Sequence, residues 1–151
     1  MQRTEGFLKT YLAVTVGAPK KPCDVIDAPM GYAEGSRYKM AVTQSGMPAV
    51  TAYETVSVCG GLALVRCRLH TGRTHQIRVH MAHLGCPLLG DWLYGTEDAR
   101  IGRPALHAEK LRLVHPLTGE TLTLFAPLPA DMAKLFPAYQ SVQADGAAPA
   151  D

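Results

Sequence analysis

Two alternating runs joined by a pair of glycines constrain the fold of this chain more than any other feature. Residues 50–58 are VTAYETVSV, and residues 62–69 are LALVRCRL. The first run places Val50, Ala52, Val56 and Val58 opposite Thr51, Tyr53, Thr55 and Ser57. Period-two alternation is typical of β-strands, and Gly60-Gly61 between the runs favours a tight turn. We therefore expect an antiparallel hairpin in the middle of the chain.

Further strands are expected on either side of this hairpin. Residues 7–16, FLKTYLAVTV, alternate so that Leu12, Val14 and Val16 share one face and Lys9, Tyr11 and Ala13 share the other. Residues 105–114 and 120–126 flank the turn sequence HPLTG and predict a second hairpin. The Pro- and Gly-rich residues 18–40 have no helical period. We expect them to form a long functional or connecting loop.

One segment changes to helical spacing. Ile77, Met81 and Leu84 lie at i, i+4 and i+7 and predict a helix over residues 74–84. Thr71 or Thr74 is expected to cap its start, and Gly85 followed by Pro87 is expected to end it. A second, short helix is expected over residues 131–136. Because strands outnumber helices, the predicted fold class is α+β: a mainly antiparallel mixed sheet with few helices.

The length of 151 residues fits one domain. We expect residues 1–137 to form it and residues 138–151, which are small and polar, to be a disordered tail. No apolar run approaches the about 20 residues that span a bilayer, and the first ten residues lack the apolar stretch of a signal peptide. The four cysteines form no C-x-x-C pair. Free thiols in a reducing compartment, the cytoplasm, are therefore expected.

Charge is unevenly distributed along the chain, although the formal net charge is only +2. No acidic residue lies between Glu54 and Asp91, while four arginines and four of the six histidines fall inside that interval. A block of one sign favours an anionic partner, and a solvated basic face is the alternative. On the predicted helix Arg78 lies beside the apolar stripe, where its planar fork suits a phosphate or carboxylate. Arg73 and His75 add donors near the helix N-terminus, which itself favours anions.

Residues 70–80, HTGRTHQIRVH, resemble the TGR-x-HQ-[IL]-R-x-H signature of the RluA-type pseudouridine synthases. Further segments match that family in the same order along the chain. They are Lys9-x-Tyr11-x-Ala13-x-x-Val16-Gly17, Pro48-Ala49-x-Thr51-x-Tyr53, Leu84-Gly85-x-Pro87-Leu88-Leu89-Gly90-Asp91, Tyr94-Gly95, Leu106-His107-Ala108, His115-Pro116 and Ala126-Pro127-Leu128-Pro129. The resemblance covers residues 9–129, and an eleven-residue motif with ordered satellites is highly specific.

The resemblance implies an enzyme that isomerises uridine to pseudouridine in ribosomal or transfer RNA without a metal or organic cofactor. In that family the target base is flipped into a cleft, which has a stacking cost of a few kcal/mol. An aspartate acts as the nucleophile, and the uracil is detached, rotated and rejoined through carbon. Tyr11 corresponds to the tyrosine that packs on the uracil, and Arg78 to the arginine that pairs with the aspartate. Lys9, Arg73, His75 and Gln76 are the expected RNA-binding residues, and Tyr11 and Arg78 are expected to border one pocket.

The sequence departs from the family pattern at the nucleophile. The family carries it in an Arg-Leu-Asp motif upstream of the K-x-Y strand, and this sequence contains no such triplet. Asp24 and Asp27 follow that strand, and Asp91 belongs to a segment whose family role is structural. We therefore expect a partial catalytic domain that is inactive alone, whether it is a fragment, a truncated product or one part of a split protein. An N-terminal segment or partner chain would supply the aspartate, and an exposed sheet edge invites a homodimer.

Three other interpretations are weighed against an enzyme. A non-catalytic RNA-binding domain derived from the same fold would keep the cleft and the basic helix, whereas an assembly protein would bind no RNA. A zinc site at His80, His83 and Cys86 has suitable ligand types. It is disfavoured because Gly85 ends the helix before Cys86 and no fourth ligand is evident. No metal and no cofactor are expected.

Overall fold

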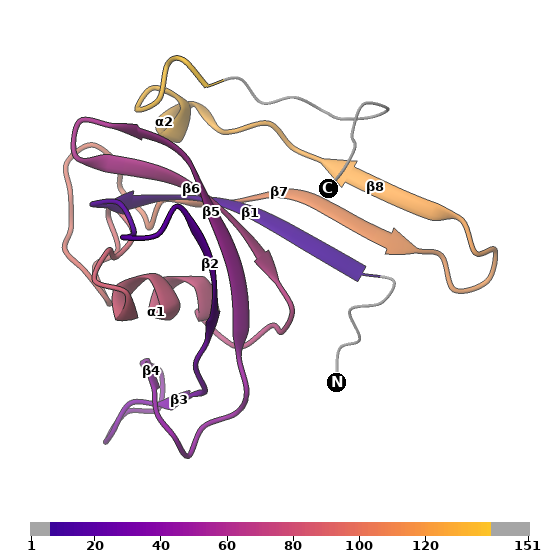
Figure 1. The fold of residues 1–151 in the computed structure, drawn as a ribbon, viewed down its shortest axis with the longest axis horizontal. Helices are drawn as coiled ribbons and strands as arrows, with labels where there is room; N and C mark the ends of the chain where they lie inside the picture. Colours follow the sequence, from indigo (N-terminus) through magenta and orange to yellow (C-terminus); the bar gives the residue numbers. More distant parts are fainter. Residues whose placement is uncertain (1–6, 140–151) are drawn as a thin grey trace.

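The computed structural model describes residues 7–139, which fold around one antiparallel sheet (Figure 1). Its six strands are β1 (Phe7–Val16), β2 (Cys23–Asp27), β5 (Val50–Cys59), β6 (Leu62–Leu69), β7 (Leu106–Val114) and β8 (Thr121–Phe125). They lie in the order β2-β5-β6-β1-β7-β8, and every ladder is antiparallel. A second sheet pairs β3 (Met30–Tyr32) with β4 (Met40–Val42). The helices are α1 (Gln76–His83) and α2 (Ala130–Ala133). The predicted α+β class is confirmed.

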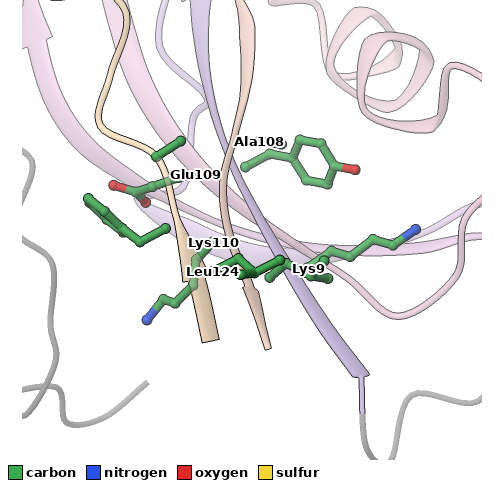
Figure 2. A pocket seen from close by; sticks show the side chains of 9 residues that line it. Lys9, Ala108, Glu109, Lys110 and Leu124 are labelled. Atoms are coloured by element: carbon green, nitrogen blue, oxygen red, sulfur yellow. The ribbon is translucent and has the colours of Figure 1, made fainter. Parts of the chain in front are cut away.

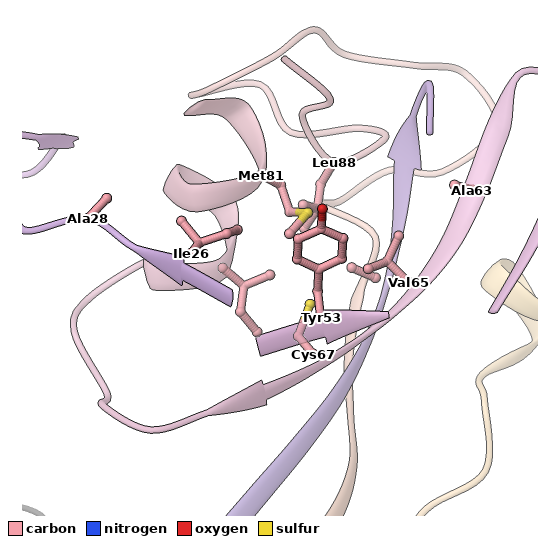
Figure 3. Packing of buried hydrophobic residues seen from close by; sticks show 10 residues of the cluster. Ile26, Ala28, Tyr53, Ala63, Val65, Cys67, Met81 and Leu88 are labelled. Carbon is pink, nitrogen blue, oxygen red and sulfur yellow. The ribbon is translucent and has the colours of Figure 1, made fainter. Parts of the chain in front are cut away.

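Helices cover opposite faces of the sheet. Tyr53, Cys67 and Ala13 form one buried cluster with Ile77 and Met81 of α1 (Figure 3). On the other face, Leu12 and Val14 pack with Leu64 and with Met132 and Phe136 at α2. The alternation predicted for residues 7–16 therefore divides β1 between two cores. The outer part of the β7–β8 hairpin extends away from both helices (Figure 1).

Both predicted hairpins are confirmed. In β5, however, the valine side of the strand is not the side that is buried throughout. Thr51 and Tyr53 are buried on the α1 face, whereas Val58 is 60% exposed. The pairing of β5 with β6 shifts between Thr55 and Ser57, so the faces change places along the strand. Thr51 tolerates burial because its hydroxyl is hydrogen-bonded to His80 and Gln76.

The expected loop over residues 18–40 contains strands that the sequence pattern did not indicate. In β2 only Ile26 is buried, so this edge strand lacks a period-two apolar signal. Strands β3 and β4 have three residues each, too few to show a period. That part of the prediction is wrong, because backbone pairing with a neighbour, and not apolar alternation, forms these strands.

The helix boundaries also differ from the predictions. Helix α1 begins at Gln76, and its N-cap is His75 in the left-handed region, with φ 58° and no side-chain cap. Neither Thr71 nor Thr74 caps it; the Thr71 hydroxyl donates instead to the side-chain oxygen of Gln76. Gly85, with φ 91°, ends the helix as predicted. Helix α2 spans 130–133, shorter than the predicted 131–136.

Tyr139 lies two residues beyond the predicted domain boundary and packs against the α2-side cluster. The rest of the predicted tail, residues 140–151, is outside the described residues. Neither helix within residues 7–139 has the length and apolar character needed to cross a bilayer.

A substitution at Gly90 tests how closely the turn before Asp91 packs against residues 101–103. Its φ is +78°, and an added Cβ would collide with the backbone carbonyl of Arg103. We expect Gly90→Ala to lower the free energy of unfolding by about 2–5 kcal/mol, because left-handed strain adds to overpacking. Gly102→Ala is the matched control, since nothing lies within 4 Å of its added Cβ. Urea unfolding measures both, and equal losses in the two variants would contradict this interpretation.

Candidate active site

The start of α1 and the loop before it carry four of the predicted site residues, Arg73, His75, Gln76 and Arg78, and side-chain hydrogen bonds anchor this region to the sheet. Gln76 is 3% exposed, and its amide nitrogen donates to the Val50 carbonyl and the Thr51 hydroxyl. Its oxygen accepts from the Thr71 hydroxyl at 2.7 Å and from the Arg73 backbone N–H at 3.0 Å. Both hydrogens and both oxygen lone pairs of the Gln76 side-chain amide are thus engaged in hydrogen bonds within the protein. Gln76 therefore acts on this site by positioning the loop that carries Arg73.

His80 continues this chain into the core. Its Nδ1 lies 2.8 Å from the Thr51 hydroxyl, and its Nε2 lies 3.0 Å from the Ala28 carbonyl. Because a carbonyl only accepts, Nε2 carries the hydrogen and Nδ1 accepts from Thr51. Burial lowers the pKa of His80, so the ring is neutral at pH 7. Neither ring nitrogen is left for a metal ion, and no metal-binding group of His, Cys, Asp or Glu occurs within residues 7–139.

Arg78 forms a buried, two-pronged ion pair with Asp91. Its Nε and Nη2 each donate to one carboxylate oxygen at 2.9 Å. The Arg78 side chain is 13% exposed and that of Asp91 is 0% exposed. Asp91 Oδ1 also accepts the backbone N–H groups of Leu93 and Tyr94. Burial alone would raise the pKa of Asp91, but the hydrogen bonds from Arg78 and from these backbone groups outweigh it and lower the pKa.

Tyr94 joins this ion pair to two other parts of the chain. The Arg78 guanidinium carbon lies 5.1 Å from the centroid of its ring, within cation–π range. Its hydroxyl accepts the backbone N–H of Met40 at 2.9 Å and lies 2.8 Å from Nδ1 of His75. Burial and the nearby Arg78 charge lower the pKa of His75. The Nδ1 of the neutral ring then accepts a hydrogen bond from the Tyr94 hydroxyl, and His75 has no role as a cation at pH 7.

Tyr11 and Lys9 lie on β1, on the face that α1 covers. Tyr11 packs against the cluster that contains Ile77 and Met81, so the strand tyrosine and the arginine helix share one side of the sheet. Burial raises the pKa of Tyr11, and its phenol stays protonated at neutral pH.

A pocket of about 250 Å³ lies over β1, β7 and β8, and Lys9 and Tyr11 line it together with mostly apolar residues of the outer hairpin. Figure 2 shows the Lys9 side chain on one side of these strands and those of Glu109 and Lys110 on the other. The lining does not include Arg73, His75, Gln76 or Arg78. The structure thus brings Tyr11 and the helix of Arg78 to one face, and a pocket bordered by both side chains stays a prediction.

Asp91 and Tyr94 were not among the predicted site residues. The helical period shows that Arg78 borders the apolar stripe, but it gives no partner thirteen residues away in a turn. The available signal was the aspartate itself, whose carboxylate accepts the N–H groups two and three residues on, the first as in an Asx turn. Arg73 contacts the Pro48 carbonyl through Nε at 2.7 Å, which holds the loop before α1 against the start of β5.

The fold matches solved structures that carry an RNA pseudouridylate synthase domain in their titles. It superposes on the structure titled Human RNA Pseudouridylate Synthase Domain Containing 1 with a TM-score of 0.72 and 27% identity, over 91% of this chain and 62% of that one. The structure titled Human RNA Pseudouridylate Synthase Domain Containing 4 gives a TM-score of 0.66 and 28% identity, over 85% and 62%.

Sequence comparison identifies the family. The RNA pseudouridylate synthase model matches residues 1–83. The uncharacterized RNA pseudouridine synthase YjbO of Bacillus subtilis is 46% identical over 84% of this chain. The ribosomal large subunit pseudouridine synthase D of Nitrosomonas europaea is 45% identical over 87%. This chain belongs to the RNA pseudouridylate synthase family, as its motifs predicted. It spans 45% and 41% of the length of these two relatives.

The buried ion pair gives a direct test of the site. We expect Asp91→Asn to lower the free energy of unfolding by about 3–5 kcal/mol, because the Arg78 charge is left buried without its partner. Asp98→Asn is the matched control: Asp98 pairs with Arg100 through the same two nitrogens at 2.9 Å but in an exposed turn, where solvent screens the charges. Chemical denaturation of both variants measures the difference. If Asp98→Asn lowers the free energy of unfolding as much as Asp91→Asn does, burial of the ion pair is not the cause of the loss.

His75 and His80 make the free energy of unfolding depend on pH. Their pKa values are lowered on folding, so the unfolded chain binds more protons below its histidine pKa of about 6.5. Stability should therefore be highest above that pH and fall on acidification through the lowered folded pKa values. Each histidine contributes a slope of at most about 1.4 kcal/mol per pH unit. Urea unfolding between pH 5 and pH 8 measures this slope, and His80→Gln should flatten it; an unchanged slope in that variant would show that His80 does not carry the effect.

Proposed function

We propose that this chain is the base-holding part of an RNA pseudouridine synthase that isomerises uridine to pseudouridine in structured ribosomal or transfer RNA. The observation that carries the proposal is the packing of Tyr11 and of the helix of Arg78 on one face of the sheet. The Tyr11 ring packs on the flipped uracil, and Arg78 orients the nucleophilic aspartate. The names of the relatives support this activity, and one of them specifies the large ribosomal subunit.

The pocket beside Tyr11 suits a flipped base. Its volume of about 250 Å³ is just below the about 300–1,000 Å³ of sites for drug-sized molecules. Its lining combines apolar side chains with the charged residues Lys9, Glu109 and Lys110, and the neutral phenol of Tyr11 presents an aromatic face. Lys9, Arg73 and His75 contact the RNA in this proposal, and Gln76 positions the loop that carries Arg73.

The nucleophile comes from outside the 151 residues in this proposal, because they contain no Arg-Leu-Asp triplet. An N-terminal segment or a partner chain supplies it. Asp91 occupies Nε and Nη2 of Arg78, and Nη1 is the nitrogen that it does not engage. A second carboxylate therefore binds Arg78 through Nη1, next to Asp91. Such a site works in the cytoplasm with no metal or organic cofactor.

Among residues 7–139, β8 is the last strand of the sheet, and its outer edge supports association with another strand. Thr121–Phe125 is TLTLF, which carries no charge, and Leu124 is 59% exposed. Edges of this kind pair readily with other chains. The occupant of this edge is the completing segment or a second copy of this chain.

We expect the chain alone to show no synthase activity, with turnover lower than in a completed enzyme by on the order of 10⁴-fold or more, because a covalent nucleophile is missing. Tritium release from RNA carrying 5-tritiated uridine measures loss of the C5 proton. Fusion of an Arg-Leu-Asp-bearing segment from a relative should restore release, and the same fusion with that aspartate changed to asparagine is the control. Release above background by the unfused chain would contradict the prediction.

The second candidate function is a non-catalytic RNA-binding domain, which the basic interval between Glu54 and Asp91 favours. Filter binding at low salt, with the fusion assay, separates the candidates. Restored release supports the enzyme, whereas intact RNA binding without restoration supports the binding domain. Absence of binding to any RNA would instead indicate a structural protein.

A further inference from the structure

The β3–β4 hairpin presents aromatic and basic side chains to solvent at one end of the molecule. Tyr32 is 62% exposed and Tyr38 is 66% exposed. Arg37 and Lys39 flank Tyr38 and are exposed as well, with Glu34 the acidic side chain on the same hairpin. Exposed aromatic faces interleaved with cations are the combination that binds single-stranded nucleic acids, by stacking on bases and by contact with phosphates.

The turn that carries these side chains is ordered by its own hydrogen bonds. The Ser36 hydroxyl oxygen accepts the backbone N–H of Tyr38 at 3.1 Å and that of Lys39 at 2.8 Å. The Ala33 N–H donates to the Lys39 carbonyl at 2.7 Å. Because the backbone is already arranged, binding here orders side chains alone, which reduces its entropic cost.

The base of the hairpin is fixed to the rest of the molecule. Met30 and Met47 exchange backbone hydrogen bonds of 2.9 and 2.7 Å, and an added Cβ on Gly46 would collide with the Met30 carbonyl. Met40 packs against the cluster that contains Val79 of α1, and its N–H donates to the Tyr94 hydroxyl. The hairpin is therefore held against α1, beside the residues that carry His75 and Arg78 (Figure 1).

We propose that the tip of the β3–β4 hairpin binds single-stranded RNA that flanks the target nucleotide. Tyr32 and Tyr38 stack on unpaired bases, and Arg37 and Lys39 contact phosphates. This inference rests on the proposed function, because the partner is the same RNA, and it adds a contact surface outside the family motifs. Unpaired RNA is favoured over duplex because bases inside a duplex have no exposed face for a tyrosine to stack on.

Binding of a fluorescein-labelled oligouridylate, measured by anisotropy, tests the inference. We expect the double variant Tyr32→Ser/Tyr38→Ser to bind about tenfold or more weakly, while Tyr32→Phe/Tyr38→Phe keeps the rings and the affinity. Equal melting temperatures of these variants and the wild-type chain would show that the exposed substitutions leave the fold intact.

The charges are tested by the salt dependence of binding. Arg37→Gln/Lys39→Gln should reduce the slope of log K against log salt concentration by about 1.4, since each single-strand phosphate contact contributes about 0.7. Lys20→Gln/Lys134→Gln removes the same charge from exposed positions outside the hairpin and should leave the slope unchanged.

The outcomes separate this inference from the proposed function. If the wild-type chain binds oligouridylate and the serine variant binds equally well, the inference fails and the proposed function stands. If the serine substitutions weaken binding of an RNA duplex and leave oligouridylate unaffected, stacking on unpaired bases is also overturned. If the wild-type chain binds neither RNA, both proposals fail.

Discussion

The structure around the site depends on one uninterrupted chain of buried hydrogen bonds, from the Ala28 carbonyl through His80 and Thr51 to Gln76. Along this chain Gln76 donates to Thr51, Thr51 to His80 and His80 to the Ala28 carbonyl, so a single tautomer of His80 and a single orientation of the Gln76 amide satisfy all three bonds. This chain fastens α1 to β5 and to the segment before β3. The helix has eight residues and no side-chain cap. These bonds and the packing of Ile77 and Met81 therefore stabilise it in place of a cap.

Once α1 is fixed, the position of Arg78 is fixed as well, and Asp91 compensates its charge inside the protein. A buried arginine without a carboxylate is costly, and Asp91 meets this requirement within the described residues. Asp91 holds the guanidinium in place through two hydrogen bonds of 2.9 Å. In the proposed enzyme, a second aspartate would meet Arg78 already oriented. Tyr94 extends the same arrangement to the β3–β4 hairpin through Met40.

Much of this architecture was predictable from local pattern, and the remainder depends on tertiary contacts. The alternation around Tyr11 and the Gly60-Gly61 turn predicted the central strands, because those strands are buried on defined faces. Strand β2 was missed, since Ile26 is its one buried residue and backbone pairing with β5 holds it in place. The start of α1 was misplaced because a histidine in the left-handed region, unlike Ser or Asp, has no cap preference to detect. The motif predicted Arg78 but not its pairing with Asp91.

The register between β1 and β7 shifts at Glu109, which has no partner on β1: Thr10 lies opposite Lys110, and Tyr11 lies opposite Ala108. An unbroken ladder would set Lys110 directly across from Lys9, and two ammonium groups would repel each other at the rim of the pocket. The extra residue instead sets Leu111 across from Lys9. One inserted amino acid thus gives the lysine beside Tyr11 an aliphatic neighbour across the ladder in place of a second ammonium group.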